Sequence, residues 1–301
     1  MDTNQNHVSA TVNATSLLSS KAVLIRLFTS AFIGNPCDKA LTAEVQNSHG
    51  TEDKRVSVRK KIMQGKELNA IAATLQNVRK LAEKLSAPWL DGGLRIVPAK
   101  SLISTKLEIE KGIRDFESKV EDFIFAYDDI IARDRIALNG TFRESDYMTP
   151  AKLRTKFSAR LEIFPIPSDF RVEGIDAAVK ADLELEMNKL TNQRISEAKR
   201  DLVSRIQDKV SHLIGKLENM TDETRLHASL VSNVSEVCAE VKAANFDDDS
   251  SLNQLADSVE KAISTLSIDN LRTDENARDD AKEIAEQALA DIQEAMAGFM
   301  G

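Results

Sequence analysis

Residues 101–138 read SLISTKLEIEKGIRDFESKVEDFIFAYDDIIARDRIAL, and this stretch decides the fold class. Large apolar side chains recur in it at alternating steps of four and three residues. They are Ile109, Ile113, Phe116, Val120, Phe123, Tyr127 and Ile130. This spacing lines them up on one face of an α-helix, as in the seam of a coiled coil. The stretch therefore predicts one helix of about 57 Å that packs against another helix.

The rest of the chain also favours helices. Its 301 residues include only 11 Gly and 6 Pro, about half of the usual share, so few turns are encoded. Residues 65–85 carry a helical apolar pattern. Four more helices are expected after Gly174, at 176–219, 222–245, 251–267 and 274–298. Ser251 and Gln254 have the spacing of a capping box at the start of the third.

Segments with alternating or continuous apolar residues predict a small sheet. They are residues 22–33, 54–62, 94–97 and 157–166. The expected fold is α-dominated α+β, with a small antiparallel sheet, long coiled-coil-like helices and an all-helical C-terminal region. We expect helices 101–138 and 176–219 to run side by side as an intramolecular coiled coil.

The charge distribution suggests a division of the chain. Residues 174–301 contain 14 basic and 26 acidic side chains, a net charge of −12. Residues 1–173 contain 26 basic and 22 acidic side chains, a net charge of +4. With the polar N-terminus, this predicts a flexible arm at 1–20, an α+β domain at 21–173 that includes helix 101–138, and an acidic helical region at 174–301.

Cysteine content and hydropathy indicate the compartment. Cys37 and Cys238 lie about 200 residues apart and do not form a disulfide framework. The N-terminus lacks the basic and apolar regions of a signal peptide, and no apolar run reaches the length of a membrane span. We therefore expect a cytoplasmic protein that does not bind membranes.

The sequence predicts no catalytic residue, no cofactor-binding residue and no metal ligand. Gly65-Lys66 lacks the upstream Gly and the hydroxyl residue of a phosphate loop. Asp247 begins a stretch like a calcium-binding loop, but Leu252 stands where that loop requires Gly. The four histidines are scattered along the chain. We expect a protein without cofactors that is not an enzyme.

One cluster of basic residues is a candidate binding site. It consists of Lys54, Arg55, Arg59, Lys60 and Lys61. Three interpretations stay open: an edge strand kept soluble by its charges, a surface for an acidic protein, or a surface for nucleic acid. Contact between this cluster and the acidic region of another copy would also give a homo-oligomer that weakens with salt.

Three stretches carry a resemblance to a known family: LFTSAFIG at 27–34, KLSAPWLDGGLRIVP at 84–98 and KLRTKFSARLEIFPI at 152–166. The order of these stretches resembles an uncharacterised domain-of-unknown-function family of tailed phages and prophages. The matching stretches lie within about 22–170, half of the chain. Genes of this family often lie beside those for a MoxR-type AAA+ ATPase and a von Willebrand A-domain protein.

The resemblance implies no particular activity, because members of the family have none assigned. We expect a non-enzymatic phage adaptor or structural protein in the host cytoplasm, with an AAA+ ATPase machine or a host factor as its partner. The alternative is a nucleic-acid-associated protein of phage replication or recombination, which would use the basic cluster.

Overall fold

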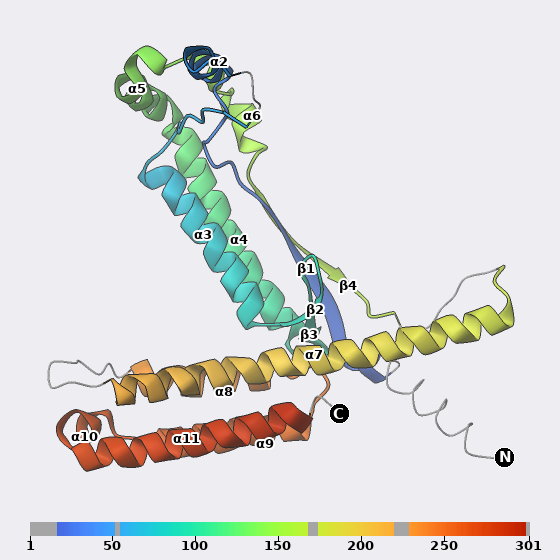
Figure 1. The fold of residues 1–301 in the computed structure, drawn as a ribbon. Helices are drawn as coiled ribbons and strands as arrows, with labels where there is room; N and C mark the ends of the chain where they lie inside the picture. Colours follow the sequence, from blue (N-terminus) through green and yellow to red (C-terminus); the bar gives the residue numbers. More distant parts are fainter. Residues whose placement is uncertain (1–16, 52–54, 168–173, 220–228, 299–301) are drawn as a thin grey trace. The chain divides into compact units, whose positions relative to one another are not determined.

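The computed structural model of the protein describes residues 17–51, 55–167, 174–219 and 229–298. Its strands are β1 (Ala22–Ser30), β2 (Ala87–Leu90), β3 (Leu94–Pro98) and β4 (Ser158–Phe164). The helices up to residue 154 are α2 (Lys39–Ser48), α3 (Lys66–Lys84), α4 (Leu102–Phe125), α5 (Tyr127–Leu138) and α6 (Pro150–Arg154). Those that follow are α7 (Ala177–Glu218), α8 (Ser229–Ala244), α9 (Ser250–Ser264), α10 (Ile268–Thr273) and α11 (Glu275–Gly298). The expected fold class is confirmed (Figure 1).

The chain divides into two compact units along a line that differs from the expected domain boundaries. Unit 1 comprises residues 1–26, 82–105 and 162–301, and unit 2 comprises 27–81 and 106–161. Unit 1 therefore adds β2 and β3 to the acidic helices. Most of the expected N-terminal arm, residues 1–16, lies outside the described residues. Its last part is helical, and Leu18 is buried in the core of unit 1.

The sheet has the strand order β2-β3-β1-β4, and β3 pairs antiparallel with both β1 and β2. The edge strand β2 was not expected, because Pro88 interrupts its pattern. Proline is tolerated at a sheet edge, since its missing N–H leaves no partner strand unsatisfied there.

The expected strand at 54–62 is wrong. Within its described part, 55–62, the backbone forms one isolated bridge, between Arg59 and Cys37. The Val58 N–H donates to Thr42 Oγ1, at 2.9 Å, and its carbonyl accepts from Asp38, also at 2.9 Å. Because the start of α2 takes these hydrogen bonds, the segment crosses that helix end as an extended loop.

The apolar seam of residues 109–130 is buried throughout, as expected. The helix that carries it is not continuous, because Ala126 has a ψ of 6° and separates α4 from α5. From Phe116 to Ile130 the seam packs in the core of unit 2 with Ile71 and Leu75 of α3, and Phe123 meets Phe157 with ring centroids 5.8 Å apart. The expected coiled coil between residues 101–138 and 176–219 is therefore wrong.

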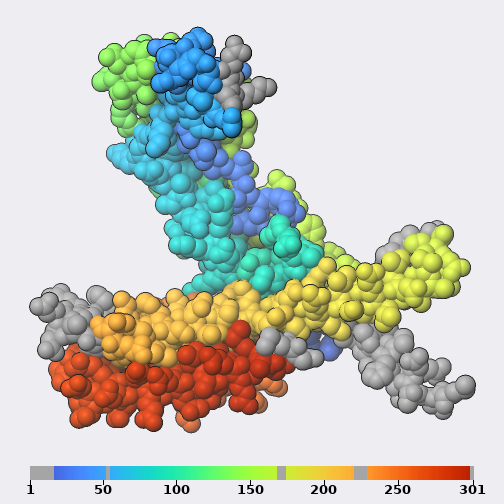
Figure 2. All heavy atoms as spheres, viewed as in Figure 1, coloured from blue at the N-terminus to red at the C-terminus, as the bar shows by residue number. Residues whose placement is uncertain are grey.

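The long helix α7 begins and ends within one residue of its expected bounds. Asp176 caps it by accepting from Ala178 N–H at 2.8 Å. Its apolar stripe packs against α8 and α11 in the core of unit 1, which also includes α9. Figures 1 and 2 show α11 running alongside α7. The expected capping box at Ser251 is wrong, since Asp249 caps α9 by accepting from Ser251 N–H at 2.8 Å.

Candidate functional site

The structure separates the members of the predicted basic cluster. Lys54 lies outside the described residues. Arg55, Arg59 and Lys61 are exposed, and Arg59 Nη1 donates to the Asn35 carbonyl at 3.2 Å. Lys60, in contrast, is buried, with 5% of its surface exposed. Three of the five predicted residues are therefore exposed, and Lys60 is not part of the exposed surface.

Lys60 is enclosed by oxygen atoms of unit 2. Its Nζ lies 2.6 Å from Asp38 Oδ2, 2.8 Å from Asp146 Oδ2 and 2.6 Å from the Thr141 carbonyl oxygen. Burial by itself would lower the pKa of Lys60, but the two carboxylates outweigh it and raise this pKa. Lys60 also lowers the pKa of Asp38. This lysine is therefore charged and holds three chain segments together.

The sequence did contain a signal for the inward position of Lys60. In extended backbone, alternate residues face the same side. Lys60 shares its parity with Val58 and Ile62, and Ile62 is fully buried. The cationic neighbours Arg59 and Lys61 have the opposite parity and are exposed.

Neither a metal-binding cluster nor a membrane-spanning helix occurs among the described residues. Across 17–51, 55–167, 174–219 and 229–298, no three His, Cys, Asp or Glu side chains gather as a metal site would require. In these same ranges, no helix combines the length and the apolar character that crossing a lipid bilayer demands.

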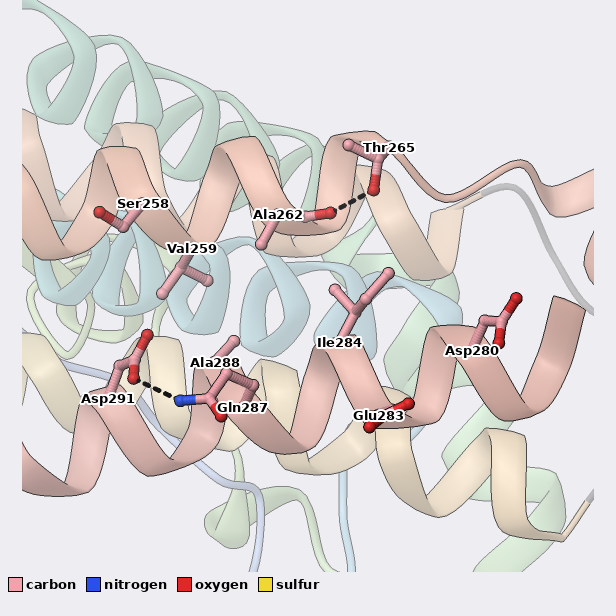
Figure 3. Close-up of a pocket in the computed structure, with 10 residues that line it drawn as sticks. All are labelled: Ser258, Val259, Ala262, Thr265, Asp280, Glu283, Ile284, Gln287, Ala288 and Asp291. Atoms are coloured by element: carbon pink, nitrogen blue, oxygen red, sulfur yellow. Dashed lines mark hydrogen bonds between the residues drawn. The ribbon is translucent and has the colours of Figure 1, made fainter.

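A groove between α9 and α11 is the best-formed candidate site, and sequence analysis missed it. It has a volume of about 670 Å³ and lies within unit 1. The two helices run antiparallel along it, with Ser258 near Asp291 at one end and Thr265 near Asp280 at the other (Figure 3). The groove is open to solvent along its length.

The floor of the groove is apolar. Val259 and Ala288 are buried there, with 1% and 4% of their surfaces exposed. Ala262 and Ile284 are partly exposed beside them. Figure 3 shows the Val259 and Ile284 side chains pointing into the space between the helices. Small residues at 262 and 288 leave room that longer side chains would fill.

The rim on the α11 side is acidic. Asp280, Glu283 and Asp291 are exposed, and Gln287 lies between them and donates to Asp291 Oδ1 at 2.9 Å. In the part of the chain that the structure describes, no Lys or Arg forms an ion pair with these three carboxylates. The groove thus combines an apolar floor with uncompensated negative charge.

The sequence held only an indirect signal for this groove. Residues 280, 284, 287 and 291 form one stripe of α11, with Ile284 among polar side chains. A stripe of this kind is typical of any solvated helix face. It becomes a groove wall only because α9 lies beside it with Ser258 and Ala262 at the facing positions.

No family model, no curated protein and no solved structure matches this chain. The candidate site therefore rests on the geometry of this molecule alone.

Proposed function

We propose that this protein is a non-enzymatic interaction protein, an adaptor or structural subunit, that binds a partner protein on its C-terminal helices. The groove between α9 and α11 carries the proposal. Apolar surface in a concave site binds protein segments by burying their apolar side chains, and a charged rim selects among them. The groove offers both features on helices held by a shared core.

The alternative, nucleic-acid binding through the basic cluster, receives less support. Each phosphate contact needs an accessible Lys or Arg. Lys60 is enclosed by Asp38 and Asp146, which removes one cation from the candidate surface. The net charge of −12 on residues 174–301 repels a polyanion.

The resemblance to a phage family supplies candidate partners for this proposal. An AAA+ ATPase machine or a host factor would contribute the segment that enters the groove. The host-cell cytoplasm would then be the place of contact.

Affinity capture with the full chain tests the proposed function. The bait is compared with Ala262→Phe, which fills the groove from α9, and with Ser258→Trp, which blocks its edge. Ser264→Phe is the matched control, because Ser264 is exposed on α9 and does not line the groove. Circular dichroism first establishes that each variant keeps its helices.

We expect mass spectrometry to find proteins that the wild type and Ser264→Phe retain and both groove variants lose. Retention of the same proteins by every bait would contradict the proposal. So would nuclease-sensitive nucleic acid as the main captured species, with its binding lost on changing Arg55, Arg59 and Lys61 to Ser.

A further inference from the structure

Resting on that proposed function, we infer that the groove between α9 and α11 binds a basic amphipathic α-helix of another protein. The helix would lie along the groove, with apolar side chains on the floor and Lys or Arg toward the α11 rim. Three features of the groove lead to this occupant: its length, its apolar floor and the placement of its carboxylates.

The length of the groove suits about three turns of helix. From Asp280 to Asp291 the rim advances eleven residues along α11, which corresponds to about 17 Å. Apolar residues at i, i+4 and i+7 of a bound helix span about 10 Å, so they fit within this length. An extended peptide would find no sheet edge here, because both walls are helices whose backbone groups bond internally.

The floor of the groove matches a narrow apolar stripe on the bound helix. Val259 and Ala262 come from α9, and Ile284 and Ala288 come from α11. Two of these four are alanines, so the bound helix must supply the larger side chains. Leucine-sized residues would exclude water from Ile284, which is partly exposed in this structure.

The charge of the rim selects a basic partner. α11 carries seven acidic and two basic side chains between residues 275 and 298. Asp280, Glu283 and Asp291 line the groove at relative positions zero, three and eleven. If the bound helix places apolar residues at i, i+4 and i+7, basic residues at i−3, i+1 and i+8 lie on one flank. Counted from the first basic residue, the other two lie four and eleven residues further along the bound helix. The carboxylates of the rim lie three and eleven residues beyond the first, so the two spacings agree to within one helical turn.

A synthetic helix serves as the probe. It is about 16 residues long, has Leu at i, i+4 and i+7 and Lys at i−3, i+1 and i+8, and carries a fluorophore for anisotropy. A second peptide has Glu in place of the three Lys. A third keeps the Lys spacing but moves these residues to the opposite face, at i−2, i+2 and i+9, so its composition and net charge are unchanged.

Two triple variants of the full chain provide matched controls. Asp280→Asn, Glu283→Gln and Asp291→Asn neutralise the groove rim. Glu275→Gln, Asp279→Asn and Glu286→Gln remove the same amount of charge from the same helix, at exposed positions that do not line the groove. Because both variants lose the same charge, a difference in their affinity for the peptide depends on where the carboxylates lie.

We expect the first peptide to bind the wild type and the outer-face variant with affinities within about threefold. Binding to the rim variant should weaken about tenfold or more at low salt, and the Glu and opposite-face peptides should bind at least tenfold more weakly. Ala262→Phe should abolish binding of the first peptide.

Equal losses in both triple variants, or equal binding of the three peptides, would overturn the inference of a basic helix. The proposed function would survive such a result if captured proteins still depended on Ala262. If sedimentation shows a wild-type dimer that Ala262→Phe and Ser258→Trp both dissociate, the occupant is a second copy and the inference is wrong. If the groove variants still bind both the peptide probe and the captured proteins, the inference and the proposed function are both wrong.

Discussion

Lys60 and Asp38 form a buried ion pair in unit 2, with Nζ and Oδ2 2.6 Å apart and side chains 3% and 5% exposed. Asp38 also caps α2, since its Oδ1 accepts from Ala40 and Leu41 N–H at 3.0 Å. A buried charge is tolerated only when its partners offset the lost hydration. Each member of the pair therefore depends on the other, and the start of α2 depends on both.

Removal of this lysine should destabilise unit 2 strongly. Lys60→Met leaves the Asp38 carboxylate buried without its cation, so we expect a loss of about 3–5 kcal/mol in the free energy of unfolding. Lys61→Met is the matched control, because Lys61 is exposed next to it, and we expect a change within about 0.5 kcal/mol. Urea unfolding followed by circular dichroism measures both. Equal stability of the two variants would show that the pair contributes nothing.

Unit 2 should lose stability in acid. Lys60 holds the pKa of Asp38 below its usual value, and Arg133 does the same for Glu67, with Nη2 and Oε2 3.2 Å apart. A carboxyl whose pKa is lowered by folding stabilises the folded state fully above its unfolded pKa of about 4. That contribution is lost as the pH falls through the lowered folded value.

The near-ultraviolet signal of Tyr127 and Tyr147 measures this loss, because both tyrosines lie in unit 2. We expect the urea midpoint to fall steadily from about pH 5 to pH 2. In Arg133→Met the slope should be shallower, since the hydrogen bond from Arg133 is the largest cause that lowers the pKa of Glu67. The same slope in this variant would contradict the assignment to Glu67.

Substitution by Asp should have very different effects on stability at two phenylalanines of α4. Phe116 is 1% exposed within the apolar seam, whereas Phe125 is 94% exposed at the end of the helix. Phe116→Asp places a charge in an apolar core, and we expect a loss of about 3–5 kcal/mol in stability. Phe125→Asp should change it by about 0.5 kcal/mol or less. Similar melting temperatures for both variants would mean that the seam does not hold unit 2 together.

The two cysteines should differ sharply in reactivity. Cys37 is exposed, whereas Cys238 is buried in α8, and burial raises the pKa of its thiol to about 12. The thiolate is the reactive species, so Cys238 should react only when the helices of unit 1 open. A colorimetric thiol reagent at pH 8 should titrate one group per chain rapidly. In Cys37→Ser we expect no rapid reaction until denaturant is added. Fast labelling of that variant would show that α8 is not stably packed.

Local patterns in the sequence determined most of the helices. The seam at residues 109–130 and the span of α7 followed from the spacing of apolar side chains. This spacing is informative because an α-helix turns by a constant angle per residue and forms its hydrogen bonds within the segment. The break at Ala126 did not show, since it shifts one backbone angle and leaves the apolar spacing intact.

Strands were determined less well, because a strand needs a partner elsewhere in the chain. Residues 54–62 alternate as a strand would, yet the start of α2 takes the hydrogen bonds of Val58. Residues 87–90 contain Pro88 and still pair with β3 at the sheet edge. Alternating apolar residues and proline positions therefore narrowed down which segments could be strands, but they did not decide which segments pair.

The sequence by itself thus determined where most of the helices lie and how charge is divided between the halves of the chain. Only the tertiary structure decided that α4 packs on α3, that Lys60 points inward, and that α9 and α11 enclose a groove with three acidic side chains on its rim. The physical reason is range. Helix formation depends on neighbours within four residues, whereas packing, buried ion pairs and grooves depend on side chains that only folding brings together.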